Sequence, residues 1–154
     1  MDLNNEIRDT YNVAAKAFVV KEDRILLCKD VAGKWDLPGG SVSPDEFFTP
    51  FEKILARELK EELGANVKYR NNGIVCIFRH RRPEVTEKGK PEKRILMLGF
   101  EIEYTGGNIV LSDEHTEHRW VNFNEALNLL NDGQLDGFKK YLEFLKSERK
   151  RIMY

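Results

Sequence analysis

Apolar residues in this sequence recur first with the period of a β-strand and then with that of an α-helix, and this alternation constrains the fold most. Residues 13–20 and 24–30 are strand-like runs on either side of the polar link Lys21-Glu22-Asp23, which predicts a β-hairpin. Residues 72–80 and 94–104 form a second pair of strand-like runs, joined by a charged connection. Because no linker-like segment interrupts this order, we predict one α+β domain over residues 1–154.

The last third of the chain contains start and stop signals of helices. Residues 118–123 favour a short strand, and Asn122 followed by Glu125 is a capping pattern that starts a helix. The dipeptide Asp132-Gly133 is expected to end that helix. The final segment has four apolar residues at helical spacing: Phe138, Tyr141, Leu142 and Leu145. We expect this second helix to pack its apolar face on the core.

Composition excludes several broad classes of protein. The chain has 26 acidic and 25 basic side chains, so its formal charge of -1 provides no general affinity for nucleic acid or an anionic membrane. No apolar run approaches the roughly 20 residues of a membrane span, and the N-terminus lacks the pattern of a signal peptide. Cys28 and Cys76 lie far apart within apolar runs, as expected of buried free thiols. We therefore expect a cytoplasmic protein.

The segment RELKEELG, residues 57–64, collects three glutamates on one side of a predicted helix. At about 100° per residue, Glu58, Glu61 and Glu62 fall within one third of the circumference. Three leucines lie on a neighbouring face that can pack on the core: Leu55, Leu59 and Leu63. Adjacent carboxylates on a helix repel each other by about 0.2–0.5 kcal/mol per exposed pair. A divalent cation bound between them makes their proximity favourable. Oxygen ligands that leave positions for water and phosphate favour Mg²⁺ or Mn²⁺ over zinc.

A solvated charged face is the simpler interpretation of these eight residues taken alone. The preceding turn Leu37-Pro38-Gly39-Gly40 favours a site instead, because glycines let the backbone approach a ligand with no side chain in the way. A turn rich in backbone groups followed by an acidic helix face is suited to binding a metal together with a phosphate.

Taken together, these residues resemble the signature of the Nudix hydrolases. That signature is a glycine, five residues, a glutamate, seven residues, and then Arg-Glu-apolar-x-Glu-Glu-x-Gly-apolar. Here Gly40 and Glu46 match its first part, and residues 57–65 match its second. The flanking segments KWDLPGG and EHTEHRWV are similar to those of the family, so the resemblance extends over residues 13–130. It implies an α/β/α sandwich with a central mixed β-sheet and a loop-helix-loop catalytic motif.

The match has one departure, a three-residue insertion in the middle of the motif. Ten residues separate Glu46 from Arg57, where the family pattern has seven. Counting back from Arg57 places Thr49 at the position of the first glutamate. The insertion therefore leaves the role of Glu46 open, whereas the second half of the motif is intact.

The inserted segment itself predicts where the extra residues lie. Two helix-start patterns follow each other, SPDE at residues 43–46 and TPFE at residues 49–52. A continuous helix across both would place Pro50 in its interior at a cost of about 3 kcal/mol. We therefore predict a separate turn over residues 43–48 and a main helix that begins at Thr49.

The resemblance implies a chemistry for these residues. Nudix enzymes cleave a nucleoside diphosphate linked to another group, by attack of water on a phosphorus of the pyrophosphate bridge, with Mg²⁺ or Mn²⁺ as cofactor. Arg57 is expected to pair with a glutamate and fix its rotamer. The implied metal ligands are three side chains and one carbonyl of the Gly39-Gly40 turn: Glu58, Glu61, Glu62 and Gly40.

The general base is expected outside the motif, in the acidic segment DEHTEH, because a carboxylate bound to a cation is a poor proton acceptor. Glu117 is the first choice and Glu114 the second, with Glu61 as the alternative within the motif. Two further residues are predicted to contact substrate: Arg79 at a strand end and Phe48 on the inserted loop.

Two classes of function are compatible with this motif. The first is a metal-dependent pyrophosphohydrolase that acts on a nucleoside triphosphate or a nucleotide sugar. The second is a Nudix-like module that binds a nucleotide without turning it over. The complete set of Arg57 and three motif glutamates favours catalysis. The expected partner is a small nucleotide, and neither a membrane nor a nucleic acid is expected to bind. The sequence leaves open whether the chain forms a homodimer.

Overall fold

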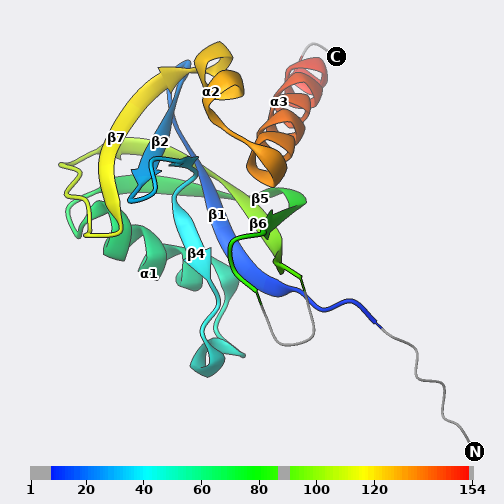
Figure 1. Cartoon of the computed structure of the whole chain (residues 1–154). Helices are drawn as coiled ribbons and strands as arrows, with labels where there is room; N and C mark the ends of the chain where they lie inside the picture. Colours follow the sequence, from blue (N-terminus) through cyan, green and yellow to red (C-terminus); the bar gives the residue numbers. More distant parts are fainter. Residues whose placement is uncertain (1–7, 87–90, 153–154) are drawn as a thin grey trace, which may run out of the picture.

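A mixed β-sheet with helices on both faces forms the centre of the computed structural model, which describes residues 8–86 and 91–152 (Figure 1). The elements are, in chain order, β1 (Asn12–Lys21), β2 (Arg24–Asp30), β3 (Trp35–Asp36), β4 (Gly39–Ser41), the 3₁₀ turn η1 (Pro44–Glu46), α1 (Phe51–Leu63), β5 (Lys68–Arg82), β6 (Lys93–Gly106), β7 (His115–Asn122), α2 (Phe123–Leu129) and α3 (Asp132–Ile152). The strand order is β3-β2-β1-β6-β5, with β4 added on β1 and β7 on β2. Strands β1 and β6 run parallel and the other pairs antiparallel.

Both predicted pairs of strands are confirmed. Strands β1 and β2 form the N-terminal hairpin, with Val20 opposite Ile25 and Lys21 opposite Arg24. Strands β5 and β6 pair antiparallel over most of their length and contain the second pair of strand-like runs. Part of the charged connection between them, residues 87–90, lies outside the described residues. None of the described helices is long and apolar enough to cross a membrane.

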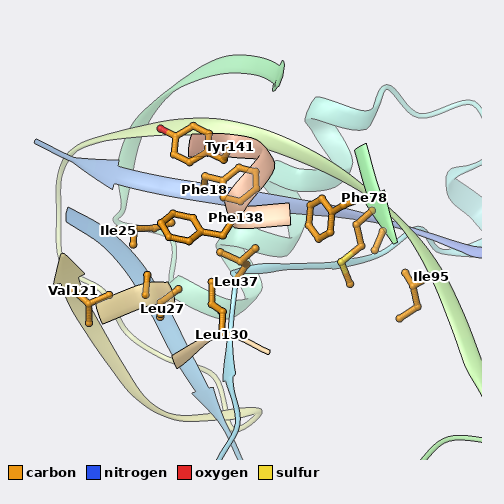
Figure 2. Close-up of a cluster of buried hydrophobic side chains, with 13 residues drawn as sticks. Phe18, Ile25, Leu27, Leu37, Phe78, Ile95, Val121, Leu130, Phe138 and Tyr141 are labelled. Carbon is orange, nitrogen blue, oxygen red and sulfur yellow. The ribbon is translucent and has the colours of Figure 1, made fainter. Parts of the chain in front are cut away.

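The sheet buries apolar side chains on both faces, which explains the nearly continuous apolar sequence of β1. On one face, Phe18 packs against Phe138 and Tyr141 of α3, and its ring stacks on that of Tyr141 at 4.6 Å between centroids (Figure 2). On the other face, α1 covers the sheet with four buried side chains: Ile54, Leu55, Leu59 and Leu63. This arrangement confirms the α/β/α sandwich. Cys28 is buried, Cys76 is half-buried, and both are free thiols.

The separate turn predicted before the main helix is confirmed, but the predicted start of that helix at Thr49 is wrong. The 3₁₀ turn η1 and the helix α1 are distinct elements, and Pro50 is the N-cap residue of α1. The N–H of Lys53 donates to the carbonyl of Pro50 at 3.0 Å, while the ψ of 140° places Pro50 itself outside the helix. Thr49 therefore stands one residue too early for its hydroxyl to cap α1.

The predicted start of α2 is confirmed, and its predicted end is wrong. The N–H of Glu125 donates to the side-chain oxygen of Asn122 at 2.8 Å, as the capping pattern requires. Helix α2 ends before Leu130, whose backbone is extended, and Asp132-Gly133 begins α3 instead of ending α2. Gly133 is required there because a Cβ atom would meet the carbonyl oxygen of Arg79 at 2.0 Å. The start of α3 thus packs directly on the backbone of β5.

Candidate active site

A cleft of about 1140 Å³ lies where the Gly-Gly turn, α1, the ends of β5 and β6 and the start of α3 meet. Its lining includes β1 and β6 residues that the parallel pairing brings together, such as Ala14 opposite Met97. The acidic face of α1 contributes three side chains: Glu58, Glu61 and Glu62. The cleft therefore collects the predicted glutamates and the turn Gly39-Gly40 in one place.

Arg57 is the centre of the motif's hydrogen bonding. Its Nε and Nη2 atoms donate to the two carboxylate oxygens of Glu46 at 2.8 and 2.6 Å. Its Nη1 donates to Glu58 at 2.8 Å and to Glu61 at 3.1 Å, and Nη2 also reaches the carbonyl of Ser41 at 3.3 Å. The hydrogen bonds from Arg57 lower the pKa of Glu46 to about 2. Glu46 thus pairs with the arginine across the three-residue insertion and holds the guanidinium in place.

Two other carboxylates of the motif, Glu58 and Glu62, are desolvated. Glu62 is only 5% exposed and accepts a hydrogen bond from the N–H of Gly39 at 2.8 Å. Burial raises its pKa to about 7, and burial also raises the pKa of Glu58. Gly40 lies against Glu58 so closely that a Cβ atom on it would come within 2.3 Å of the carboxylate oxygen. The absence of a side chain at Gly40 is therefore what admits Glu58 to the cleft.

These donors fit a divalent cation, although they do not form a finished site. Within residues 8–86 and 91–152, no three Asp, Glu, His or Cys side chains are grouped closely enough to hold a metal alone. Glu58 and Glu61 are turned toward Arg57, and the side chain of Glu61 is 58% exposed. Buried carboxylates with raised pKa values gain from a nearby cation, and hard oxygen ligands suit Mg²⁺ or Mn²⁺. Glu58 and Glu62 would hold such a cation, with remaining positions for a carbonyl, water and phosphate.

A buried lysine of the cleft was missed from the sequence. Lys16 is 6% exposed, and its Nζ donates to Asp36 at 3.1 Å, to the carbonyl of Leu37 at 2.9 Å and to that of Gly39 at 3.1 Å. Burial alone would lower the pKa of Lys16, but the carboxylates of Asp36 and Glu62 raise it above its ordinary value. Lys16 is therefore a charged ammonium inside the cleft.

A glutamine from the last helix also holds the turn Leu37-Pro38-Gly39-Gly40. The N–H of Leu37 donates to the side-chain oxygen of Gln134 at 2.7 Å, and Gln134 is 8% exposed. Both backbone groups of Leu37 are thus bound by side chains from distant elements, Lys16 of β1 and Gln134 of α3. The sequence signal for Lys16 was a single polar residue within an apolar run, whereas no local signal pointed to Gln134.

The structure does not bring Glu117, the first candidate for the general base, into the cleft. Strand β7 begins at His115, so Glu117 lies within a strand instead of on the expected loop. Its carboxylate pairs with Arg119 at 2.7 Å and with Lys29 at 3.9 Å. Glu114, the second candidate, precedes β7 and lines the cleft.

The two residues predicted to contact substrate also lie elsewhere. Arg79 is not among the described residues around the cleft, but it lines an adjoining pocket of about 620 Å³ that shares His80, Arg81, Glu92 and Asp132 with it. Phe48 is 93% exposed and packs edge-on against Phe47, again away from the described cleft lining. The cationic side chains that do line the cleft, besides Lys16, are Lys34, Arg81, Arg82 and Lys93.

Solved structures of known proteins share this fold. The MutT protein from Methanosarcina mazei Go1 is 26% identical and superposes with a TM-score of 0.71, over 93% of this chain and 99% of that chain. An ADP-ribose pyrophosphatase from Streptococcus suis 89-1591 has a TM-score of 0.63 over 91% of this chain and 93% of its own. At 22% identity, the second likeness concerns the fold alone.

Sequence comparison extends this likeness to the family level. The NAD-capped RNA hydrolase NudC of Stutzerimonas stutzeri (strain A1501) is 32% identical over 106 residues, which are 66% of this chain and 33% of that protein. The chain thus spans about a third of the length of the curated relatives it matches. The family model of the NUDIX domain matches residues 10–142, a range that contains the whole Arg57-centred motif. This chain therefore belongs to the Nudix hydrolase family.

Proposed function

We propose that this chain hydrolyses a pyrophosphate bond in a nucleoside diphosphate linked to another group, with Mg²⁺ or Mn²⁺ as cofactor. The observation that carries the proposal is the pair of desolvated carboxylates, Glu58 and Glu62, beside the Gly39-Gly40 turn. Arg57 supports it, because its hydrogen bonds set the directions of Glu58 and Glu61. A bound divalent cation supplies neutralisation of the pyrophosphate charge and activation of the attacking water.

The charge of the cleft supports a phosphorylated substrate. Arg82 and Lys34 lie on either side of Glu84, at 3.1 and 3.9 Å, and all three line the cleft. The exposed cations attract the phosphates of a substrate. The glutamates at the centre of the cleft favour a substrate whose phosphates carry a bound metal ion. A nucleoside triphosphate or a nucleotide sugar has the required bridge. The curated relatives are NAD-capped RNA hydrolases, which adds NAD-capped RNA as a third class of candidate substrate.

Glu114 is the candidate general base. It lines the cleft, and it lies outside the motif whose carboxylates face the cation or Arg57. A carboxylate that binds no cation keeps its lone pairs for the proton of the attacking water. Glu61 is the alternative base, because its side chain is the most exposed of the three motif glutamates on α1.

A hydrolysis panel tests the proposal. Substrates are a nucleoside triphosphate, a nucleotide sugar, NAD and NAD-capped RNA, each with Mg²⁺, with Mn²⁺ or with a chelator, and products are identified by phosphorus NMR in ¹⁸O-labelled water. We expect turnover of at least one substrate that requires metal and is lost in Glu62→Gln but not in the surface variant Glu125→Gln. Nucleotide binding without turnover across the panel would favour the binding module over the enzyme.

A further inference from the structure

The ammonium group of Lys16 lies among oxygens that could otherwise bind a metal. We propose that Lys16 is a resident cation of the cleft, which permanently fills one cation position and so reduces by one the number of divalent ions that the cleft binds. The inference rests on the metal site of the proposed function and concerns how that site is filled.

The surroundings of the Lys16 ammonium are those of a bound cation. Its Nζ has four oxygen neighbours: Asp36 Oδ1 at 3.1 Å, Asp36 Oδ2 at 3.3 Å, Leu37 O at 2.9 Å and Gly39 O at 3.1 Å. A carboxylate and backbone carbonyls are also the hard oxygen donors that Mg²⁺ and Mn²⁺ prefer. The ammonium therefore competes directly with a divalent ion for this set of ligands.

Lys16 cannot easily withdraw from this position. It lies in the middle of β1, opposite Gly39 of β4, between Ala15 and Ala17, which are both fully buried. The side chain of Lys34, another cation of the cleft, is by contrast 64% exposed, and it pairs with Glu84 at 3.9 Å. Lys16 is thus built into the core of the sheet, with its charged end directed at the turn.

The backbone of Gly39 connects this ammonium to the expected metal ligands. The carbonyl of Gly39 accepts from Lys16, whereas its N–H donates to Glu62. The divalent ion that remains must therefore rely on Glu62 and Glu58, because Lys16 already engages Gly39 O and Asp36. A neutral residue at position 16 would release all four of the oxygens that Lys16 contacts and leave one more uncompensated negative charge, which is what a further divalent ion needs.

Counting bound Mn²⁺ by electron paramagnetic resonance tests this inference without relying on activity. We expect Lys16→Met to bind one more Mn²⁺ per chain than the wild type. The double variant Lys16→Met/Asp36→Asn should return to the wild-type count, because the released carboxylate is then missing. Lys53→Met is the matched control: it removes one positive charge from an exposed position of α1 and should leave the count unchanged.

The outcomes separate this inference from the proposed function. Equal Mn²⁺ counts for Lys16→Met and the wild type would overturn the role of Lys16 while leaving the metal site intact. A wild-type chain that binds no Mn²⁺ would overturn the metal site, and the assignment of Lys16 with it. Circular dichroism of each variant shows whether the fold is kept, because Lys16→Met leaves Asp36 without its buried partner.

A measurement on the wild type keeps the inference testable if Lys16→Met does not fold. A buried, hydrogen-bonded ammonium exchanges its protons slowly and gives a proton–nitrogen NMR signal that solvated lysines lack. We expect one such signal, absent from the charge-neutral double variant, and we expect it to persist at saturating Mg²⁺. Loss of the signal on addition of Mg²⁺ would mean that the metal displaces Lys16, and the inference would be wrong.

Discussion

Glu46 and Glu62 belong to one motif, yet their electrostatic surroundings are opposite. Glu46 ends the turn η1 and receives two hydrogen bonds from Arg57, which lower its pKa to about 2. Glu62 lies near the end of α1 with one hydrogen bond from the N–H of Gly39, and its burial raises the pKa to about 7. The first carboxylate is hydrogen-bonded directly to an arginine of the chain, whereas the second accepts no hydrogen bond from another side chain among the described residues, and in the proposed function it binds a divalent cation.

The same distinction separates the two acidic residues near β7. Glu117 is paired with Arg119 and Lys29, as Glu46 is paired with Arg57. Glu114 lines the cleft, as Glu62 does. Glu46 and Glu117 are thus held by ion pairs, whereas Glu62 and Glu114 line the cleft, and in the proposed function these two serve a ligand or a proton.

Removing the charge of Glu62 should have the largest effect on activity. Glu62→Gln is expected to lower kcat on the order of 10²-fold or more, because in the proposed function this carboxylate binds the metal. Glu46→Gln should lower kcat much less, because its carboxylate holds Arg57 and does not face the cation. Steady-state kinetics with saturating Mg²⁺ measures both. Equal losses in the two variants would abolish the distinction between them.

The pH dependence of stability sharpens the same comparison. The pKa of Glu62 is about 7 in the folded chain, above its ordinary value of 4.5, so the wild type loses stability as the pH rises through this interval. In chelator, Glu62→Gln should therefore be more stable than the wild type at pH 8, by about 1–3 kcal/mol, and equal to it near pH 4. Denaturant unfolding at both pH values checks this. A less stable Glu62→Gln at pH 8 would assign the carboxylate a structural role.

Glu46 should show the opposite sign. Its pKa is about 2 in the folded chain, below the ordinary 4.5, so the stability it contributes is present above pH 4.5 and is lost as the pH falls toward 2. We expect Glu46→Gln to melt at a lower temperature than the wild type at pH 7, with a difference that shrinks below pH 4.5. Thermal melts across this range measure it, and a difference independent of pH would contradict the pairing with Arg57.

The two residues near β7 provide the next largest effect. Glu114→Gln is expected to lower kcat on the order of 10²-fold and to remove the acidic limb of the pH–rate profile. Glu117→Gln, which breaks only ion pairs with Arg119 and Lys29, should keep the limb and most of the turnover. If both variants keep the limb, Glu61→Gln is the next variant to examine, because the base then lies within the motif.

Arg57 is hydrogen-bonded to Glu46 and also to glutamates of α1. A substitution that weakens these hydrogen bonds should therefore affect both stability and turnover. Lysine cannot reproduce the paired hydrogen bonds to Glu46 or the fixed fork that also reaches Glu58 and Glu61. We expect Arg57→Lys to lower kcat on the order of 10-fold through misplacement of Glu58. The pH dependence of its melting temperature should lose the contribution of Glu46, and retention of that contribution would show that lysine takes over the pairing.

Regular elements of this fold were predictable where the sequence pattern is local and repeated. The hairpin of β1 and β2, the pair β5 and β6 and the cap at Asn122 all depend on residues close together in the chain, and the structure confirms them. The predicted helix start at Thr49 was wrong because the backbone of Pro50 is extended, and the predicted helix end at Asp132 was wrong because a tertiary contact places the start of α3 there. Gly133 packs on the backbone of β5, which no local pattern reveals.

The sequence correctly predicted which residues of the motif lie together, and it was a poorer guide to the residues from other elements that surround them. Arg57 and the glutamates of α1 come together as their spacing on a helix requires. The contact of Gln134 with Leu37 joins positions 97 residues apart, so only the folded chain shows it. Glu117 and Arg79 depend on where a strand begins and which way each side chain points. A shift of one residue in a strand reverses that direction, so sequence patterns do not specify it.

The smallest expected effect concerns the first residues of the helices. It tests whether the inserted turn and α1 form one structural unit. Asn122 accepts a hydrogen bond from the N–H of Glu125, so Asn122→Ala should lower the free energy of unfolding by about 1 kcal/mol. Thr49 precedes the N-cap residue Pro50, so Thr49→Ala should change it by less than about 0.5 kcal/mol. Urea unfolding of both variants at one pH provides the comparison. Equal losses would mean that Thr49 caps α1 in solution, so that the inserted turn and the helix form one unit and Glu46 is placed by the helix as well as by Arg57.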